Sequence, residues 1–390
     1  MKLFGLAAIA ASSQALALAP GAFSVDTLAS RGPRLFDTAV ERSRLLSKYE
    51  TTDDEHGSAV KRSAQQHGSV IIEASDDGSS YLVPTVIGNQ TLNLIYDTGS
   101  ADLWVYSNAT LPNESRGHNV YVPSSSASSL PGYSWSIKYS SGISVNGTVY
   151  TDTVKAGPVV ATKQAVEAAV RVPYDVDADG IMGLASGAIN QVQPVKQTTF
   201  FETILPTLPK KVFAASFQTK GPGSWDFGFL DPAKYKGEIR YANVLLPFKH
   251  WRTVAGQYSV GDGPLSGPGA TIGNVTFDSG SELLYLPDAV VDAYYARVEG
   301  FQLTFGGFPA FPCGSTLPDL HFQVGDGINL TVPGANLNMG HIDRTSNRCT
   351  AAVTNLGIMK SSVLGNVFFK NYYVVHSFED GVPKLGFGSR

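Results

Sequence analysis

Residues 96–105 read YDTGSADLWV, and a shorter copy of this stretch, FDSGSELL, occupies residues 277–284. In both copies an Asp, a hydroxyl residue, a Gly and a Ser follow one short apolar run and precede another. Short runs of apolar, β-branched and aromatic residues that are broken by Gly and Ser are typical of strands joined by turns. The chain therefore carries two acidic turns, at Asp97 and at Asp278, each set between two predicted strands.

A second element recurs at matched spacing from the two acids. Gly183, in the run Ile-Met-Gly, follows Asp97 by 86 residues, and Gly365, in the run Val-Leu-Gly, follows Asp278 by 87 residues. Repetition of two elements at one spacing is the signature of a duplicated structural unit. We therefore predict two homologous lobes, each with one acidic loop.

The rest of the chain favours a mainly β fold with two β-barrel-like lobes and an active-site cleft between them. Its length of 390 residues exceeds that of one ordinary core, and 40 Gly and 22 Pro indicate many turns. Strands are predicted at Val70–Ile72, Tyr81–Val83, Leu92–Tyr96, Val145–Tyr150 and Tyr372–Val375, and helices at Gln197–Leu205 and Asp288–Val298. We place the N-terminal lobe, with Asp97, at residues 63–250 and the C-terminal lobe, with Asp278, at residues 251–390.

Composition excludes several classes of function. Charged residues make up 16% of the chain, against about 25% in an average globular protein, and 29 Lys and Arg stand against 33 Asp and Glu. A nucleic-acid-binding protein would show a basic stripe, so we expect no nucleic-acid partner. No apolar run of 18 residues follows the N-terminus, so no membrane span is expected. Two Cys are too few for a Cys-rich metal site, and neither Gly-x-Ser-x-Gly nor His-Glu-x-x-His occurs, so we expect no metal and no cofactor.

The N-terminus has the pattern of a secretory signal peptide. Lys2 precedes the apolar stretch Leu3–Ala10, and Ala15-Leu16-Ala17 fits the small-x-small cleavage pattern. Cleavage after Ala19 is the alternative, but it would leave Pro20 at the new N-terminus. We therefore predict a signal peptide at residues 1–17 and a secreted, extracellular protein.

Residues 18–62 are expected to form a propeptide. This segment is rich in Arg and Lys and ends at the dibasic pair Lys61-Arg62. In a secreted protein, a dibasic pair in a polar linker predicts a processing site, so the mature chain would begin at Ser63. The pattern leaves open whether the chain cleaves itself or is cleaved by a dibasic-specific protease.

Two acids on facing loops predict a specific chemistry. If the lobes are related by a pseudo-two-fold axis, Asp97 and Asp278 meet at that axis and share one proton, because two close carboxyls do not both ionise readily. The ionised acid can take a proton from water while the protonated acid polarises a carbonyl group. The residues that support the acids are Thr98, Gly99 and Ser100 in the first turn and Ser279, Gly280 and Ser281 in the second. We expect the two hydroxyls that directly follow the acids to bond across the interface between the loops.

At these residues the chain closely resembles the pepsin family of aspartic endopeptidases, especially the secreted fungal penicillopepsin and aspergillopepsin types. The resemblance runs from about Tyr81 to Gly388. It rests on the motifs at Tyr96–Val105, Asp179–Ala185, Asp226–Asp231, Asp278–Ser281 and Leu364–Phe368. It implies that Asp97 and Asp278 are the catalytic pair and that Ser100 bonds Asp97. It also implies a monomer that acts on protein and peptide substrates, with its own propeptide as an inhibitor in which Lys48 lies between the acids.

The family closes its cleft with a β-hairpin flap that carries a Tyr, and Tyr139 matches that residue. Its phenol is expected near Trp104. Many fungal relatives carry an acid two residues after this Tyr, whereas this chain has Ser140-Ser141, so a preference for Lys beside the cleaved bond is in doubt. Ile181 either lines a pocket for a large apolar side chain or packs in the core.

Three further features of the sequence concern the two Cys, the glycosylation sequons and the C-terminal strand. Cys313 and Cys349 match the single disulfide of the family. N-glycosylation sequons begin at Asn89, Asn108, Asn113, Asn146, Asn274 and Asn329, and we expect Asn274 to be poorly accessible because it precedes the Asp278 loop. His376-Ser377 stands where Phe-Asp is usual, and we interpret this position as peripheral.

Two functions of different classes remain compatible with the sequence. The first is an acid endopeptidase that prefers large apolar residues around the cleaved bond. The second is a pepsin-like fold that only binds peptides or proteins. Relatives of the second kind typically lose an acid or the flap Tyr, whereas this chain keeps Asp97, Asp278 and Tyr139.

Overall fold

The computed structural model describes residues 65–74, 81–138, 144–218, 222–267, 269–304, 308–342, 346–357 and 359–390, all within one compact unit, Leu35–Arg390. The predicted signal peptide and propeptide, with Lys48, Lys61 and Arg62, lie outside the described residues, as do Tyr139, Ser140 and Ser141 of the predicted flap.

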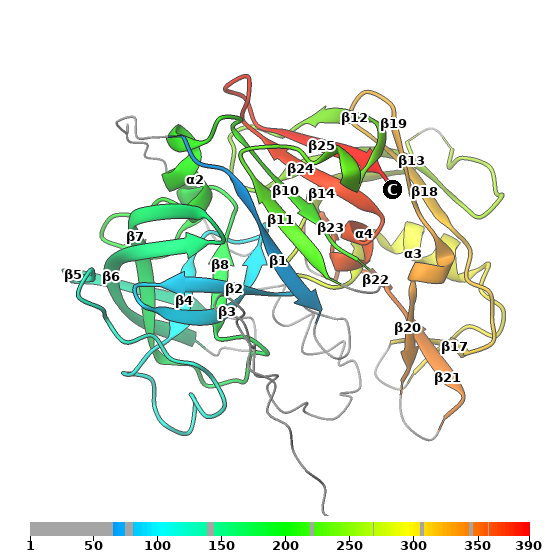
Figure 1. The fold of residues 1–390 in the computed structure, drawn as a ribbon. Coiled ribbons are helices and arrows are strands. Elements are labelled where there is room, and N and C mark those ends of the chain that lie inside the picture. Colours follow the sequence, from blue (N-terminus) through cyan, green and yellow to red (C-terminus); the bar gives the residue numbers. More distant parts are fainter. Residues whose placement is uncertain are drawn as a thin grey trace, which may run out of the picture. The chain divides into compact units, whose positions relative to one another are not determined.

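Among the described residues, the largest sheet contains 14 strands and includes both the first strand, β1, and the last strand, β25 (Figure 1). In spatial order they are β12 (Lys236–Asn243), β25 (Lys384–Ser389), β24 (Tyr372–Ser377), β10 (Val212–Ser216), β11 (Gly223–Phe227), β1 (Gly68–Ala74), β2 (Tyr81–Ile87), β3 (Gln90–Asp97), β8 (Gly180–Gly183), β4 (Leu103–Tyr106), β7 (Val159–Arg171), β6 (Ser144–Ala156), β5 (Ser128–Lys138) and β9 (Val192–Gln193). Because β2 also pairs with β6, the six strands β2, β3, β8, β4, β7 and β6 close into a barrel.

The C-terminal half forms two smaller sheets. The first has 7 strands, in the order β19 (Ile328–Val332), β18 (Leu320–Val324), β13 (Arg252–Val260), β14 (Thr271–Phe277), β23 (Ser362–Leu364), β15 (Leu284–Leu286) and β22 (Val353–Asn355). The second has 4 strands, in the order β16 (Gln302–Leu303), β17 (Pro309–Pro312), β21 (Arg348–Ala351) and β20 (Asn338–His341). The predicted mainly β fold class is confirmed.

The repeat in the sequence corresponds to a repeat in strand pairing. In the first half, β8 lies parallel to β3 and antiparallel to β4, so it is inserted between the strands on either side of Asp97. In the second half, β23 lies parallel to β14 and antiparallel to β15, on either side of Asp278. Each acid therefore sits at the end of a strand that is held on its flank by the second repeated element.

The repeated glycines allow this insertion. A Cβ on Gly183 would lie 2.6 Å from the backbone nitrogen of Ala101, and a Cβ on Gly365 would lie 2.5 Å from the carbonyl oxygen of Ser281. No side chain fits at these distances. The second repeated element thus packs against the backbone just after each acidic turn. This contact fixes the position of each acid relative to its own half of the chain.

The described helices are short: α2 (Phe200–Ile204), α3 (Asp288–Tyr295) and α4 (Asn366–Phe369). The helix predicted at Gln197–Leu205 begins later because Thr199 caps it, accepting from the Glu202 N–H at 3.4 Å while the Glu202 carboxylate accepts from the Thr199 N–H at 3.0 Å. Within the described residues, no helix has the length and apolar character needed to cross a bilayer.

Candidate active site

The two acids hold the same position in the two halves, and each is fully buried, with 0% of its surface exposed. Asp97 ends β3, and its carboxylate accepts hydrogen bonds from the Gly99 N–H at 2.8 Å and from the Ser100 hydroxyl at 2.6 Å. Asp278 follows β14 and accepts from the equivalent groups of the second turn: the Gly280 N–H donates at 2.9 Å and the Ser281 hydroxyl at 2.7 Å. These donors hold each carboxylate in one orientation and offset the cost of burying it.

The residues after the acids bond the two turns to each other. The Thr98 N–H donates to the Ser279 hydroxyl at 3.0 Å, and the Ser279 N–H donates to the Thr98 hydroxyl at 3.0 Å. Each hydroxyl then donates onward across the interface, Thr98 to the Phe277 carbonyl at 2.8 Å and Ser279 to the Tyr96 carbonyl at 2.7 Å. This reciprocal network has the local two-fold symmetry that the repeat predicts.

Gly99 brings the first turn against the second acid. A Cβ on Gly99 would lie 2.5 Å from Oδ1 and 2.6 Å from Oδ2 of Asp278, so the Asp278 carboxyl packs directly on the Gly99 backbone. The Gly99 N–H meanwhile donates to Asp97. One residue therefore contacts both acids, and the two carboxyls belong to one site.

A second pair of buried acids lies behind the first turn, and sequence reasoning missed it. Asp102 and Glu167 are hydrogen-bonded to each other, and the Asn190 side-chain amide donates to both, at 2.9 Å in each case. Burial raises the pKa of Asp102 to about 7, and the Asp97 charge acts in the same direction. Burial and then the Asp102 charge raise the pKa of Glu167 well above its ordinary value. Both carboxyls therefore bind a proton more readily in the folded chain than they would in water.

The predicted pocket residues that the structure describes lie in an apolar cluster beside the first acid. Trp104 on β4 pairs with Ile181 on β8. Both side chains are buried, and Trp104 stacks on Trp135 with ring centroids 6.2 Å apart. Ile95, two residues before Asp97, belongs to the same cluster. Large apolar side chains thus surround one flank of the Asp97 turn.

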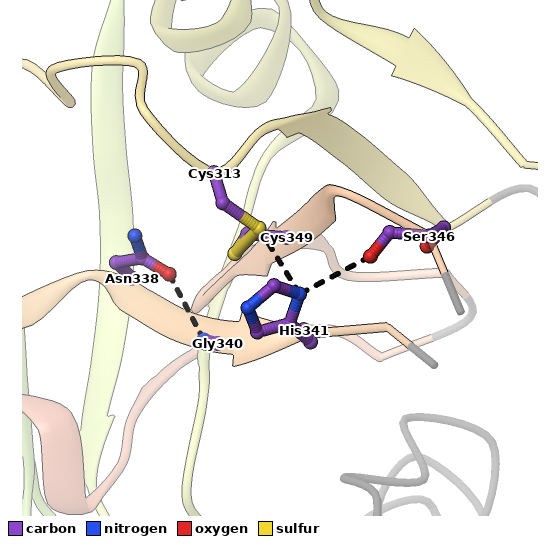
Figure 2. Close-up of a disulfide and its surroundings, with 6 residues drawn as sticks. All are labelled: Cys313, Asn338, Gly340, His341, Ser346 and Cys349. Carbon is purple, nitrogen blue, oxygen red and sulfur yellow. Dashed lines mark hydrogen bonds between the residues drawn. A yellow bond between two sulfur atoms is a disulfide. The ribbon is translucent and has the colours of Figure 1, made fainter. Parts of the chain in front are cut away.

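The predicted disulfide is present and joins Cys313, next to β17, to Cys349 on β21. In Figure 2 the imidazole of His341 lies beside it, with Nδ1 3.5 Å from the Cys313 sulfur and 3.2 Å from the Ser346 carbonyl oxygen. Both sulfurs are committed to the S–S bond, so this group of two Cys and one His does not present thiolate ligands to a metal.

Two sequence-based expectations about accessibility are wrong. Asn274 is exposed, because it occupies an outward position of β14, and so are the sequon residues Asn89, Asn108, Asn113 and Asn329, whereas Asn146 is half-buried. His376 is not peripheral: it is fully buried in β24, and its ring lies against those of Phe213 and Trp251.

The chain matches one protein-family model and is similar over most of its length to several known fungal proteins. Residues 80–389 match the family model described as eukaryotic aspartyl protease. Aspergillopepsin-1 of Aspergillus flavus is 40% identical over 366 residues, which cover 92% of this chain and 88% of the relative. Aspergillopepsin-1 of Aspergillus clavatus is 37% identical over 397 residues, covering 100% of this chain and 97% of the relative. Penicillopepsin-2 of Penicillium janthinellum is 39% identical over 352 residues, which cover 88% of this chain and 87% of the relative.

Proposed function

This chain belongs to the eukaryotic aspartyl protease family and is an aspartic endopeptidase, and we propose that it is a secreted enzyme, made as a zymogen, that hydrolyses internal peptide bonds at acid pH. The observation that carries the mechanism is the reciprocal pair of hydrogen bonds between Thr98 and Ser279, which holds the Asp97 and Asp278 turns together. We assign these two acids as the catalytic residues.

In the proposed reaction the two carboxyls share one proton, the arrangement typical of aspartic proteases. The ionised acid takes a proton from a water molecule, and the water oxygen attacks the carbonyl carbon of the peptide bond. The protonated acid gives its proton to the carbonyl oxygen, forming a neutral tetrahedral diol. The acid that took the proton from water then gives it to the amide nitrogen. As the C–N bond breaks, the other acid takes a proton from one hydroxyl of the diol, so the pair again holds one shared proton.

The substrate proposed is an extended peptide with large apolar or aromatic residues around the cleaved bond. The apolar cluster of Trp104, Trp135 and Ile181 beside the first acid supports this choice. Ser141 stands where many fungal relatives carry an acid, so the chain lacks that anchor for Lys. Cleavage of a peptide library tests the proposal, and cuts mainly beside Lys or Arg would contradict it.

Secretion and inhibition by a propeptide are supported by the composition of residues 1–62. The apolar segment Leu3–Ala10 precedes a small-x-small site, and a basic segment follows that ends at Lys61-Arg62. Basic side chains suit a segment that inhibits by lying over two carboxylates. As pH falls these carboxylates protonate, the attraction weakens and the propeptide is released.

Titration with a statine-type peptide inhibitor tests the active site itself. Such a compound presents a hydroxyl in place of the attacked carbonyl, so an enzyme with both acids in register binds it tightly and loses activity in proportion. A chain that binds peptides but neither cleaves them nor binds the inhibitor tightly would instead be a binding protein.

A further inference from the structure

A histidine from the segment between the two halves contacts the first acidic turn. His250 is buried, with 9% of its surface exposed, and its Nδ1 lies 3.3 Å from the carbonyl oxygen of Gly99. A carbonyl oxygen only accepts hydrogen bonds, so Nδ1 carries the proton and donates.

The contact between His250 and Gly99 affects the active site because the Gly99 backbone touches both acids. Its N–H donates to the Asp97 carboxylate at 2.8 Å, and its backbone packs on the Asp278 carboxyl. A shift of the Gly99 backbone therefore changes the surroundings of both acids at once. His250 holds this backbone at its carbonyl group.

The segment that carries His250 is itself fixed to both halves of the site. The indole N–H of Trp251 donates to the Leu184 carbonyl at 2.8 Å, and the Leu184 N–H donates to the Asp97 carbonyl at 2.8 Å. The Phe277 N–H, directly before Asp278, donates to the Trp251 carbonyl at 3.0 Å. Because the neighbours of His250 are anchored to both acidic turns, its ring is placed against Gly99 by a rigid support.

We propose that His250 is a positioning residue for the reaction, acting through its Nδ1–H bond to Gly99 to keep the two acids in register. The role differs from that of Thr98 and Ser279, which bond the two turns directly. It rests on the proposed two-acid mechanism, because positioning has a kinetic effect only if both acids act on one substrate.

Two substitutions separate the hydrogen bond from the bulk of the ring. His250→Leu removes the donor and retains an apolar side chain, whereas His250→Asn places an amide nitrogen at the same distance from the backbone as Nδ1. His321→Leu is the matched control, since the Nδ1 of His321 on β18 bonds the Thr331 hydroxyl at 2.8 Å within the C-terminal half.

The variants are expressed as the full 390-residue chain, and kcat and KM are measured at acid pH with an internally quenched peptide. Active sites are counted with a statine-type inhibitor. We expect His250→Leu to lower kcat about 10-fold with KM unchanged, since misplacing a catalytic group costs up to about 100-fold. His250→Asn should recover most of that loss, and His321→Leu should match the parent. A parental kcat in His250→Leu, or equal losses in the Leu and Asn variants, would overturn the proposal.

A second measurement does not depend on activity or on the stability of a variant. The ¹⁵N chemical shifts of the His250 ring in the parent chain report which nitrogen carries the proton. The inference requires a protonated Nδ1 at every pH at which the protein is folded, and an unprotonated Nδ1 would overturn it. A parent chain without peptidase activity would instead contradict the proposed function, and the shifts would still test the His250 contact.

Discussion

The imidazole ring of His376 lies flat against the ring of Phe213, with centroids 4.3 Å apart and planes 3° apart. Burial lowers the pKa of His376 to about 3, against a smaller opposing contribution from the Phe213 backbone. The folded pKa is below the unfolded value of about 6.5, so the folded state disfavours protonation. The stability present above pH 6.5 is therefore lost as pH falls from 6.5 toward 3, inside the acid range in which we expect the enzyme to work.

We predict that His376→Phe makes the protein more resistant to acid. Phe fills a similar volume in this aromatic contact and cannot be protonated, so the pH-linked loss of stability, roughly 5 kcal/mol at full extent, disappears. Urea midpoints measured by Trp fluorescence at pH 6.5 and pH 3.5 should differ less in the variant than in the parent. His67→Phe, at an exposed position, is the control, and an unchanged pH dependence in His376→Phe would contradict the prediction.

The Asp102–Glu167 pair should have the opposite pH dependence. The folded pKa values of both acids are raised, to about 7 for Asp102, so the stabilising proton is fully present below pH 4 and is lost as pH rises through 7. Glu167→Gln supplies a permanent donor to Asp102. We expect it to stabilise the protein at pH 8 by on the order of 2 kcal/mol and to change little at pH 4. The urea midpoint at the two pH values checks this, with the exposed Glu299→Gln as control; equal effects at both pH values would refute it.

Substitution of either acid that we assign as catalytic should abolish hydrolysis. One acid cannot serve as base and as proton donor in the same step, so Asp97→Asn and Asp278→Asn should each lower kcat by about 1,000-fold or more. The exposed Asp262→Asn should keep parental activity. Thermal melts establish that the variants are folded, and more than a few per cent of residual activity would rule out the two-acid assignment.

We predict that kcat depends on the hydroxyl group of the residue that follows each acid, and that the additional methyl group of Thr has little effect on kcat. Ser279→Thr keeps the donor to the Tyr96 carbonyl and the acceptor for the Thr98 N–H, so we expect near-parental kcat. Ser279→Ala and Thr98→Val each break the reciprocal network and should lower kcat. In a double-mutant cycle the two losses should be non-additive by about 0.5–3 kcal/mol. Strict additivity would show that the two hydroxyls act independently.

Removal of Lys48 should weaken the latency of the precursor. An ammonium between Asp97 and Asp278 would keep both carboxylates ionised, so no proton would be shared and hydrolysis would stop. A Lys48→Ala precursor held at neutral pH should therefore mature faster and cleave a quenched peptide sooner than the parent, while Arg34→Ala should behave as the parent does. If Lys48→Ala stays as latent as the parent, Lys48 is not the inhibitory group.

The sequence predicts the acidic turns well because their signals are local. Strand, acid, hydroxyl and Gly follow one another directly at Asp97 and Asp278, and the repeat supplies the relation between the copies. The Asp102–Glu167 pair gives no such signal, because the pairing of Trp104 with Glu167 across β4 and β7 brings the acids together from distant parts of the chain.

The position of His376 was mispredicted for a related reason. Residues in a strand point alternately to its two faces, and only the packing of neighbouring strands decides which faces are buried. β24 lies between β10 and β25, which the local sequence does not reveal. His250 was missed because its partner is a backbone carbonyl, to which residue identity gives no clue.

The place of β24 and β25 in the 14-stranded sheet has a consequence for biosynthesis. These strands are translated well after β10 and β12, yet they pair with them. The barrel of β2, β3, β8, β4, β7 and β6 contains only residues 81–183 and can close while translation continues. The strands β10 and β12 must wait for residues 372–389 before their free edges are covered. We therefore expect a ribosome-bound chain that ends before β24 to depend on chaperones and to be sensitive to proteases along these edges.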